Sequence, residues 1–215
     1  MAVYAIGDLH LSFQTNKPMD VFSSEWTNYE QTLMNNWQNI VTSQDTVIIP
    51  GDFSWAMYLE EAVEDFSYLS RLNGKKILLK GNHDYWWETK KKMTGFLQSN
   101  NFSNIDFLYN NSFEIEDVNF CGTKGYDLKE ADQKIINREI SRFSISYQSI
   151  KNKDKKTIAV FHYPPEKELE YMMKEYGIEQ CIFGHLHGLK SESYQNEGHT
   201  LVSADYVRFT PVKII

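Results

Sequence analysis

Residues 3–10 read VYAIGDLH, a short apolar run that ends in a glycine and then in two side chains able to bind a metal, Asp8 and His10. Four more apolar runs, at residues 47–49, 77–79, 158–161 and 181–183, also end in polar residues of this kind. In chain order, those that follow the five runs are Asp8 and His10, then Asp52, then Asn82, His83 and Asp84, then His162, and last His185 and His187. Ligands of open α/β sheets bind beyond the carboxyl ends of the strands. We therefore expect these side chains to gather at one edge of a sheet.

The five runs are short and unbroken, which is typical of strands buried on both faces. Between them, apolar residues recur at three- and four-residue steps and predict helices over about residues 26–40, 59–69, 136–150 and 169–176, the first with Ser23 or Ser24 as its N-cap. From about residue 192, polar and apolar residues alternate, which predicts antiparallel strands completing a second sheet. The pattern favours an α/β fold, a four-layer α/β/β/α sandwich of two stacked mixed sheets flanked by helices.

Composition bounds the class of protein. The 215 residues are 41% hydrophobic and 24% charged and contain no linker-like stretch, so we expect one globular domain over residues 1–215. There is no apolar run long enough for a membrane span and no secretory signal, and Cys121 and Cys181 lie in apolar surroundings that favour buried thiols. These features predict a cytoplasmic protein. With 22 basic and 29 acidic residues the net charge is −7, which argues against nucleic acid as the partner.

The strand-end residues together predict a metal centre. Residues two apart in an extended segment point to the same side, so Asp8 can converge with His10, and His185 with His187. Any one of these histidines could be an ordinary hydrogen-bonded core residue, and any one of the acids a turn former. That explanation would have to hold separately at all five strand ends. Five of the six histidines lie in these clusters, and only His199 lies outside.

The number and type of donors indicate a binuclear site. There are too many candidate ligands for one tetrahedral zinc ion, namely Asp8, His10, Asp52, Asn82, His162, His185 and His187. Shared between two divalent ions, these imidazole and oxygen donors suit manganese, iron, zinc, cobalt or nickel, and we take manganese as the first expectation.

The order D-x-H, G-D, G-N-H-D, H, G-H-x-H, spread over residues 7–188, resembles that of the calcineurin-like metallophosphoesterase superfamily. The resemblance implies a pair of stacked sheets flanked by helices. It also implies a ligand set for each ion, with Asp52 bridging: Asp8, His10, Asp52 and His187 for the first, and Asp52, Asn82, His162 and His185 for the second.

The resemblance further implies a chemistry. His83 would be a catalytic group beside the substrate, and Asp84 would orient its imidazole. A metal-bound hydroxide would attack the phosphorus of a small-molecule or nucleotide-type phosphoester, in a phosphodiesterase or phosphomonoesterase reaction. Two dications, less the charges of Asp8, Asp52 and the hydroxide, leave about one positive charge to attract phosphate.

One departure narrows the substrate class. Residues 51–57 read GDFSWAM, without the second acid and the arginine of the G-D-x-x-D-R-G block in protein Ser/Thr phosphatases, and the third block is GNHD rather than GNHE. The chain resembles the small bacterial-type phosphohydrolases more closely. The rival hypothesis is a catalytically inactive scaffold of the same fold that binds proteins, but such members lose the catalytic histidine or the ligands, which are intact here.

Several neighbouring residues have two interpretations. Trp55, Trp86, Trp87 and Tyr163 flank the motif blocks and either line a substrate pocket or pack in the core. Lys124 and Tyr126, in the glycine-punctuated segment CGTKGY, either contact the substrate or form a surface turn. Lys17 belongs to a loop, residues 16–19, that could cover the site.

Overall fold

Alternate residues of the buried strands pack into different apolar layers. On strand β2 (Thr46–Ile49), Val47 and Ile49 pack with helix residues, whereas Ile48 packs with residues of a second sheet. This alternation follows from the two-residue period of a strand. Repeated across the strands, it produces three apolar layers: one between the sheets, and one between each sheet and its helices.

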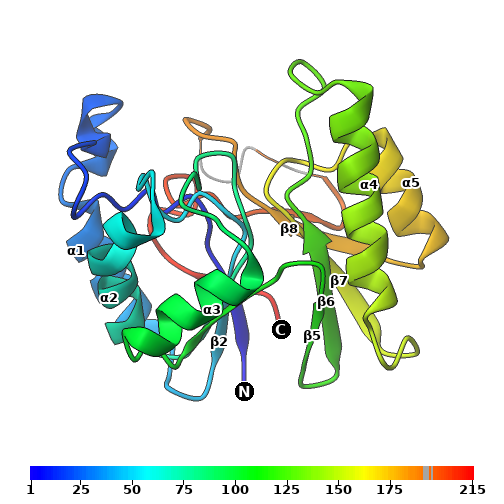
Figure 1. The fold of residues 1–215 in the computed structure, drawn as a ribbon, viewed down its shortest axis with the longest axis horizontal. Coiled ribbons are helices and arrows are strands. Elements are labelled where there is room, and N and C mark those ends of the chain that lie inside the picture. Colours follow the sequence, from blue (N-terminus) through cyan, green and yellow to red (C-terminus); the bar gives the residue numbers. More distant parts are fainter. Residues whose placement is uncertain (191–193, 195) are drawn as a thin grey trace.

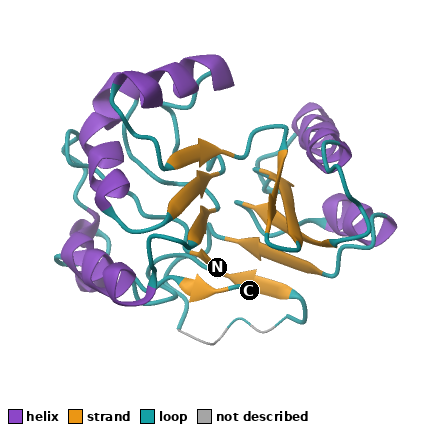
Figure 2. Cartoon of the chain, turned by 90° about the horizontal axis from the view of Figure 1, so that it is seen from below, coloured by secondary structure: helices purple, strands orange, loops and turns teal. Residues whose placement is uncertain are grey.

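The computed structural model describes residues 1–190, 194 and 196–215, and within them two five-stranded sheets face each other (Figures 1 and 2). The first sheet has the order β10 (Val212–Lys213), β1 (Val3–Ala5), β2, β3 (Lys75–Leu78), β4 (Ile105–Phe107). The second has the order β5 (Ser112–Ile115), β6 (Val118–Thr123), β7 (Lys156–Phe161), β8 (Gln180–Phe183), β9 (His199–Leu201). Neighbouring strands are parallel except at the edges, where β10 and β5 run antiparallel to their partners.

Helices cover the outer face of each sheet (Figure 2). The first sheet carries α1 (Tyr29–Ile40), α2 (Val63–Arg71) and α3 (Lys90–Ser99), and the second carries α4 (Gln133–Gln148) and α5 (Lys167–Glu175). Short 3-10 turns lie at Met19–Val21, Ser24–Trp26 and Leu59–Ala62. The predicted four-layer α/β/β/α sandwich of mixed sheets is confirmed.

Several local predictions need correction. The Ser23 hydroxyl accepts from the Glu25 N–H and so caps the 3-10 turn, whereas α1 begins after Asn28, whose side chain makes no capping bond. The start of the segment CGTKGY, residues 121–123, belongs to the buried strand β6 rather than to a surface turn, and helix α3 was not predicted.

The C-terminal prediction was wrong about pairing. Strand β9 is parallel to β8, and the last strand, β10, joins the first sheet beside β1. Residues 191–193 and 195, part of the segment predicted to alternate, lie outside the described residues.

The topology brings the ends of both sheets together. Strands β1, β2 and β3 are parallel neighbours in one sheet, and β7 and β8 are parallel neighbours in the other. Just after β1, Gly7 forms an isolated β-bridge with Ser203, which follows β9. This bridge connects the two sheets at this edge. The predicted ligand clusters therefore come to one place.

Across the described residues, every helix is too short or too polar to cross a lipid bilayer. Both cysteines are buried and free, as expected. The cytoplasmic location and the single domain over residues 1–215 stay predictions.

Candidate metal centre

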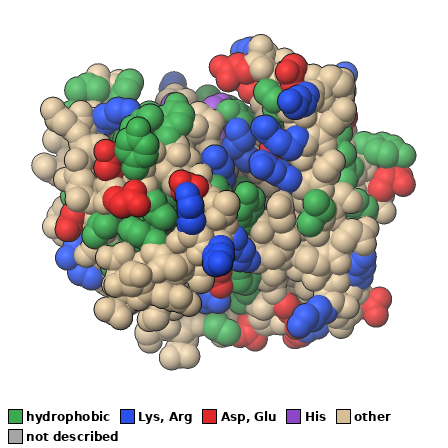
Figure 3. All heavy atoms as spheres, viewed as in Figure 1, with side chains coloured by type: hydrophobic (Ala, Val, Ile, Leu, Met, Phe, Trp, Pro, Cys, Tyr) green, Lys and Arg blue, Asp and Glu red, His purple; other side chains and the backbone are tan. Residues whose placement is uncertain are grey.

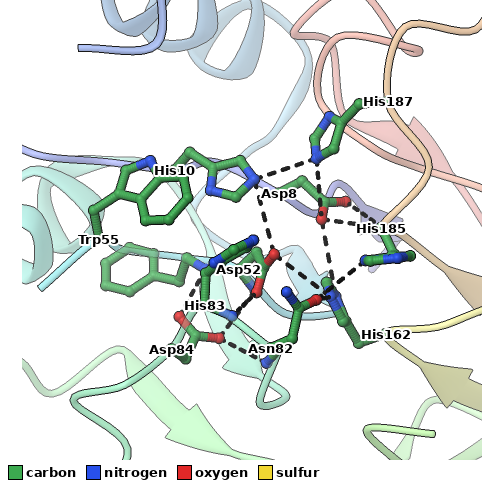
Figure 4. A network of polar contacts seen from close by, with 12 residues as sticks. Asp8, His10, Asp52, Trp55, Asn82, His83, Asp84, His162, His185 and His187 are labelled. Carbon is green, nitrogen blue, oxygen red and sulfur yellow. Dashed lines mark hydrogen bonds and ion pairs between the residues drawn. The ribbon is translucent and has the colours of Figure 1, made fainter. Parts of the chain in front are cut away.

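The turns after the strands have an unusual backbone. Asp8, His10, Asp52 and His185 adopt the left-handed region, with φ of 55°, 46°, 51° and 69°. Side chains other than glycine rarely adopt it, and residues held there gather at functional sites. These turns aim side chains from both sheets into one space (Figure 4).

Two glycines permit close approach between the blocks. A Cβ atom added to Gly184 would overlap the Asp8 carboxylate, and one added to Gly81 would overlap Asp52. A residue with a side chain at either position would displace an acid from the centre. The glycines of the G-H-x-H and G-N-H-D blocks are therefore required by the packing.

The first group of donors comes from four residues on three loops. The Nε2 atom of His187 lies 3.2 Å from Nε2 of His10 and 3.8 Å from Oδ1 of Asp8. The same nitrogen of His10 lies 3.8 Å from Oδ2 of Asp52. Oxygen and nitrogen atoms of Asp8, His10 and His187 all lie within 4.8 Å of one another, so they could hold one ion.

The second group lies on the other side of Asp52. The Nε2 atom of His162 is 2.6 Å from Oδ1 of Asn82 and 3.5 Å from Oδ2 of Asp52, and Nδ1 of His185 is 3.1 Å from the same Asn82 oxygen. Asp8, Asp52 and His162 form a further set within 4.8 Å. All seven predicted ligands thus meet in this centre, and Asp52 lies between the two groups.

Outer hydrogen bonds fix two of the imidazoles. Nδ1 of His162 lies 3.0 Å from the Pro50 carbonyl, and Nδ1 of His187 lies 2.9 Å from Oδ1 of Asp205. A proton on Nδ1 leaves the Nε2 lone pair free for a metal. Asp205 was not singled out from the sequence, although it follows strand β9 as the other ligands follow theirs.

The protonation states suit metal binding. Burial raises the pKa of Asp52 to about 6 and that of Asp8 to about 8, whereas burial lowers the pKa of His162 to about 3 and that of His185 to about 4. Metals bind neutral imidazoles and ionised carboxylates. A divalent cation would offset the desolvation that raises the pKa values of both acids. The donor set therefore fits divalent cations.

The pKa of His187 is shifted in the opposite direction from those of His162 and His185. Burial lowers the pKa of His187, but the hydrogen bond to Asp205 and the charges of Asp8 and Asp205 outweigh it and raise that pKa to about 9. Without a cation, this imidazole is therefore protonated and compensates the acids. A metal would replace that proton.

His83 lies beside the donor residues. Within the described structure its imidazole makes no hydrogen bond to any of them. Its backbone N–H donates to Oδ1 of Asp52 at 2.7 Å, while its ring centroid is 4.4 Å from that of Trp55. Its Nδ1 atom is buried and has no hydrogen-bond partner among the described residues. Burial lowers the pKa of His83, and the charge of Asp52 partly reverses this.

Asp84 has a different role from the expected one. Its carboxylate accepts from the backbone N–H groups of Asp52, Phe53, Ser54 and Gly81 and from the Trp86 indole, and none of its hydrogen bonds reaches the His83 imidazole. The expectation that Asp84 orients that ring directly is therefore corrected. A buried carboxylate with five donors joins the loop after β2 to the loop after β3 and so positions His83 through the backbone.

A cavity of about 230 Å³ opens over the donors. Its lining includes the polar residues Asp52, His83 and His185, and the apolar residues Met19, Phe22 and Trp26 form its apolar wall. Trp55 also lines the cavity and stacks on His10, with ring centroids 4.8 Å apart, as the pocket interpretation predicts. The ammonium of Lys17 lies 5.1 Å from the Trp55 ring, so the loop of residues 16–19 does reach the site.

Of the other residues that flank the motif blocks, Trp86 belongs to the core and Tyr163 contacts a donor residue. Trp86 is buried in the core beneath Asp84. Tyr163 packs on His185, with ring centroids 4.3 Å apart. Tyr126 is buried and Lys124 is half-buried, so the surface turn expected for them is wrong.

Comparison with known proteins agrees with this arrangement. A family model described as calcineurin-like phosphoesterase matches residues 1–189, a range that contains all seven donors and His83. The chain belongs to the calcineurin-like phosphoesterase family. Membership implies metal-dependent phosphoester hydrolysis, and the resemblance seen in the motif order is confirmed.

The individual proteins that this chain resembles are distant in sequence. The uncharacterized protein MJ1445 of Methanocaldococcus jannaschii is 30% identical over 91 residues, which cover 40% of this chain and 48% of that protein, about half of its length. The crystal structure of phosphopantetheinyl hydrolase (PptH) from Mycobacterium tuberculosis has a TM-score of 0.60 at 11% identity, covering 100% of this chain and 95% of that one. Protein AQ665 from Aquifex aeolicus has a TM-score of 0.56 at 18% identity, covering 99% and 95%. At these identities the two structures share the fold.

Proposed function

We propose that this phosphoesterase uses two divalent metal ions, manganese first among the candidates, to hydrolyse a phosphoester of a small-molecule or nucleotide-type substrate. The observation that carries the proposal is the pair of donor groups on either side of Asp52. Asp8, His10 and His187 would hold one ion with Asp52, and Asn82, His162 and His185 would hold the other with Asp52. No cysteine takes part, in agreement with a catalytic rather than a structural site.

Bound divalent ions supply positive charge for the phosphate oxygens and make water nucleophilic at neutral pH. The chain's own residues position the reactants. Asp84 holds the backbone of residues 52–54, and the imidazole of His83, which lines the cavity, would donate a hydrogen bond or a proton to the oxygen of the leaving group. His187 and His162 are held in fixed tautomers by Asp205 and Pro50.

The cavity suits a small organic phosphoester. Its volume of about 230 Å³ accommodates a phosphate group and part of one substituent, and its apolar wall of Met19, Phe22 and Trp26 suits a carbon-rich leaving group. The sequence lacks the second acid and arginine of protein Ser/Thr phosphatases, which argues against a phosphoprotein substrate.

The test compares bis-p-nitrophenyl phosphate with p-nitrophenyl phosphate, using protein reconstituted with Mn²⁺. We expect hydrolysis of at least one ester, its loss with EDTA, and its restoration by Mn²⁺. Asp52→Asn should lose both activity and bound metal by elemental analysis, whereas His199→Ala, outside the centre, should keep both. Metal-loaded protein that hydrolyses neither ester would contradict the proposal.

The inactive-scaffold hypothesis finds no support in this site. Each donor and His83 is present and points into the centre (Figure 4). A scaffold would have no requirement for imidazole and carboxylate donors from five separate loops to meet at one place.

A further inference from the structure

A second cavity, of about 260 Å³, lies beside the metal centre at the same edge of the fold. It is lined by the residues that follow β3 and β4, the last residues of β6, the segment before α3, and Arg142 on α4. It therefore lies where the carboxyl ends of strands from both sheets meet, the usual place for ligands in α/β folds.

We propose that this cavity binds a second anionic group, a phosphate or carboxylate, on the same substrate whose phosphoester is cleaved at the metal centre. The inference rests on the proposed function and narrows its substrate to a phosphoester with a further anion a few bonds away. The residues that would bind this group are Lys80, Lys124, Arg142 and Trp87.

The charged side chains of the cavity are mainly cationic. Lys80, Lys124 and Arg142 line it, and neither lysine pairs with a carboxylate among the described residues. Figure 3 shows Lys and Arg side chains gathered near the middle of this face, close to a histidine. The chain as a whole has a net charge of −7, so its overall composition does not explain a cluster of Lys and Arg side chains at this place.

The two acids at the cavity already have partners. Glu88 lines the cavity and pairs with Lys92 at 3.1 Å. Glu139 is fully buried behind it and accepts from Arg142 at 2.9 Å and from Thr123. The ammonium groups of Lys80 and Lys124 therefore remain without a fixed counter-charge among the residues described.

A neutral donor points to the same ligand. Trp87 lines the cavity and is 9% exposed, and its Nε1 atom is buried without a hydrogen-bond partner in the described structure. Indole, ammonium and guanidinium groups donate hydrogen bonds and accept none. A ligand rich in acceptors and negative in charge would satisfy all four residues, whereas a cation or a hydrocarbon would satisfy none.

Lys124 links this cavity to the metal centre. Its carbonyl accepts from the backbone N–H groups of His162 and Tyr163, and its ammonium lies 5.5 Å from the Tyr163 ring. On the other side, Lys80 directly precedes the G-N-H-D block. One substrate can therefore reach both places.

The first experiment measures inorganic phosphate binding by calorimetry to metal-free protein, in which the metal centre lacks its cations. We expect binding that Lys80→Gln and Trp87→Phe each weaken about tenfold, the loss of one hydrogen bond to a charged group. Trp87→Phe keeps the packing and removes only the N–H. Lys75→Gln, at the other end of β3 and half exposed, is the matched control and should leave binding unchanged.

The second experiment compares substrates with Mn²⁺-loaded enzyme in two pairs: adenosine 3′,5′-bisphosphate with AMP, and 2-phosphoglycerate with glycerol 2-phosphate. At least one pair should show a kcat/KM ratio of about ten or more in favour of the doubly anionic member. That ratio should fall severalfold in Lys80→Gln and Trp87→Phe and persist in Lys75→Gln.

The two experiments separate the two proposals. If the Mn²⁺-loaded enzyme hydrolyses neither nitrophenyl ester but phosphate binding depends on Lys80 and Trp87, the proposed function fails and the anion site stands. Phosphate binding that is absent, or is the same in the variants, would overturn the site. Preference ratios near one in both pairs would overturn its role in substrate selection and leave phosphate as a separate ligand.

Discussion

The Nδ1 atom of His187 lies 2.9 Å from Oδ1 of Asp205, a residue 18 positions further along the chain. The same carboxylate accepts from the backbone N–H of Gly188 at 2.8 Å, so it holds both the ring and the loop. His187 therefore presents Nε2 to the metal centre. Strand β9, which precedes Asp205, is thus part of the centre although it contributes none of the seven donors.

Asp205→Asn should weaken the metal centre without removing a ligand. The amide holds the His187 tautomer less firmly, and loss of such an outer partner costs about 10–100-fold in metal affinity. Competition with a chromogenic chelator measures the change. Asp117→Asn, at a highly exposed carboxylate, is the control and should bind metal as the wild type does. Equal affinity of Asp205→Asn and wild type would contradict the role of this contact.

His83→Ala should separate catalysis from metal binding. The proposed role of the His83 imidazole is to donate a proton, which alanine cannot do. The backbone N–H of residue 83 is unchanged by the substitution and keeps its hydrogen bond to Asp52. We expect turnover to fall about 10²–10⁴-fold with metal content unchanged by elemental analysis. Loss of metal in this variant would instead make His83 a ligand.

Gly184→Ala should disrupt the centre through packing alone. The new methyl group would overlap the Asp8 carboxylate, so we expect lower metal content and a lower melting temperature. Gly95→Ala in helix α3 is the matched control, because nothing lies within 4 Å of its Cβ position. That control should stabilise the protein by about 0.5–1 kcal/mol. A Gly184→Ala protein with full metal content would show that the loop can move aside.

Lys76 predicts a pH dependence of stability away from the metal centre. Its ammonium is fully buried and donates to the carbonyls of Leu72 and Gly74, and burial lowers its pKa to about 7. In the unfolded chain the lysine keeps its proton to a pH near 10.5, so between these values the unfolded state binds more protons. The free energy of unfolding should therefore rise with pH in this window.

The measurement compares wild type with Lys76→Met by urea denaturation at pH 7 and pH 9, with metal chelated in both. The wild type should gain on the order of 2 kcal/mol relative to the variant between these values. Parallel changes in the two proteins would show that Lys76 keeps an ordinary pKa.

Local patterns predicted the metal centre because every ligand follows a buried strand directly. The apolar run and the polar cluster are neighbours in sequence, and the parallel sheets bring the clusters together. Asp205 follows strand β9 in the same way, but this strand was expected only as part of an alternating stretch from about residue 192, without bounds that would place Asp205 just beyond its end. The role of Asp84 depends on contacts with residues 52–54, some 30 positions earlier, which no local pattern shows.

The elements missed from the sequence have weak patterns of their own. Helix α3 buries only Met93 and Leu97, too few for a visible stripe. Strand β6 contains Asn119 and Gly122, which are typical of turns, yet it is fully buried. Gly122 lies against the backbone of Val160 on the neighbouring strand β7. Pairing with distant strands decides β6, and packing of two side chains on the core decides α3; neither kind of contact is visible in a local segment.

The position of metal ions around Asp52 tests the central claim most directly. A crystal structure of the Mn²⁺-loaded protein, with anomalous scattering measured at the manganese edge, would locate them. We predict two peaks, one among Asp8, His10, Asp52 and His187 and the other among Asp52, Asn82, His162 and His185, with the Asp52 carboxylate between them. A single peak, or none within coordination distance of Asp52, would contradict the proposed mechanism.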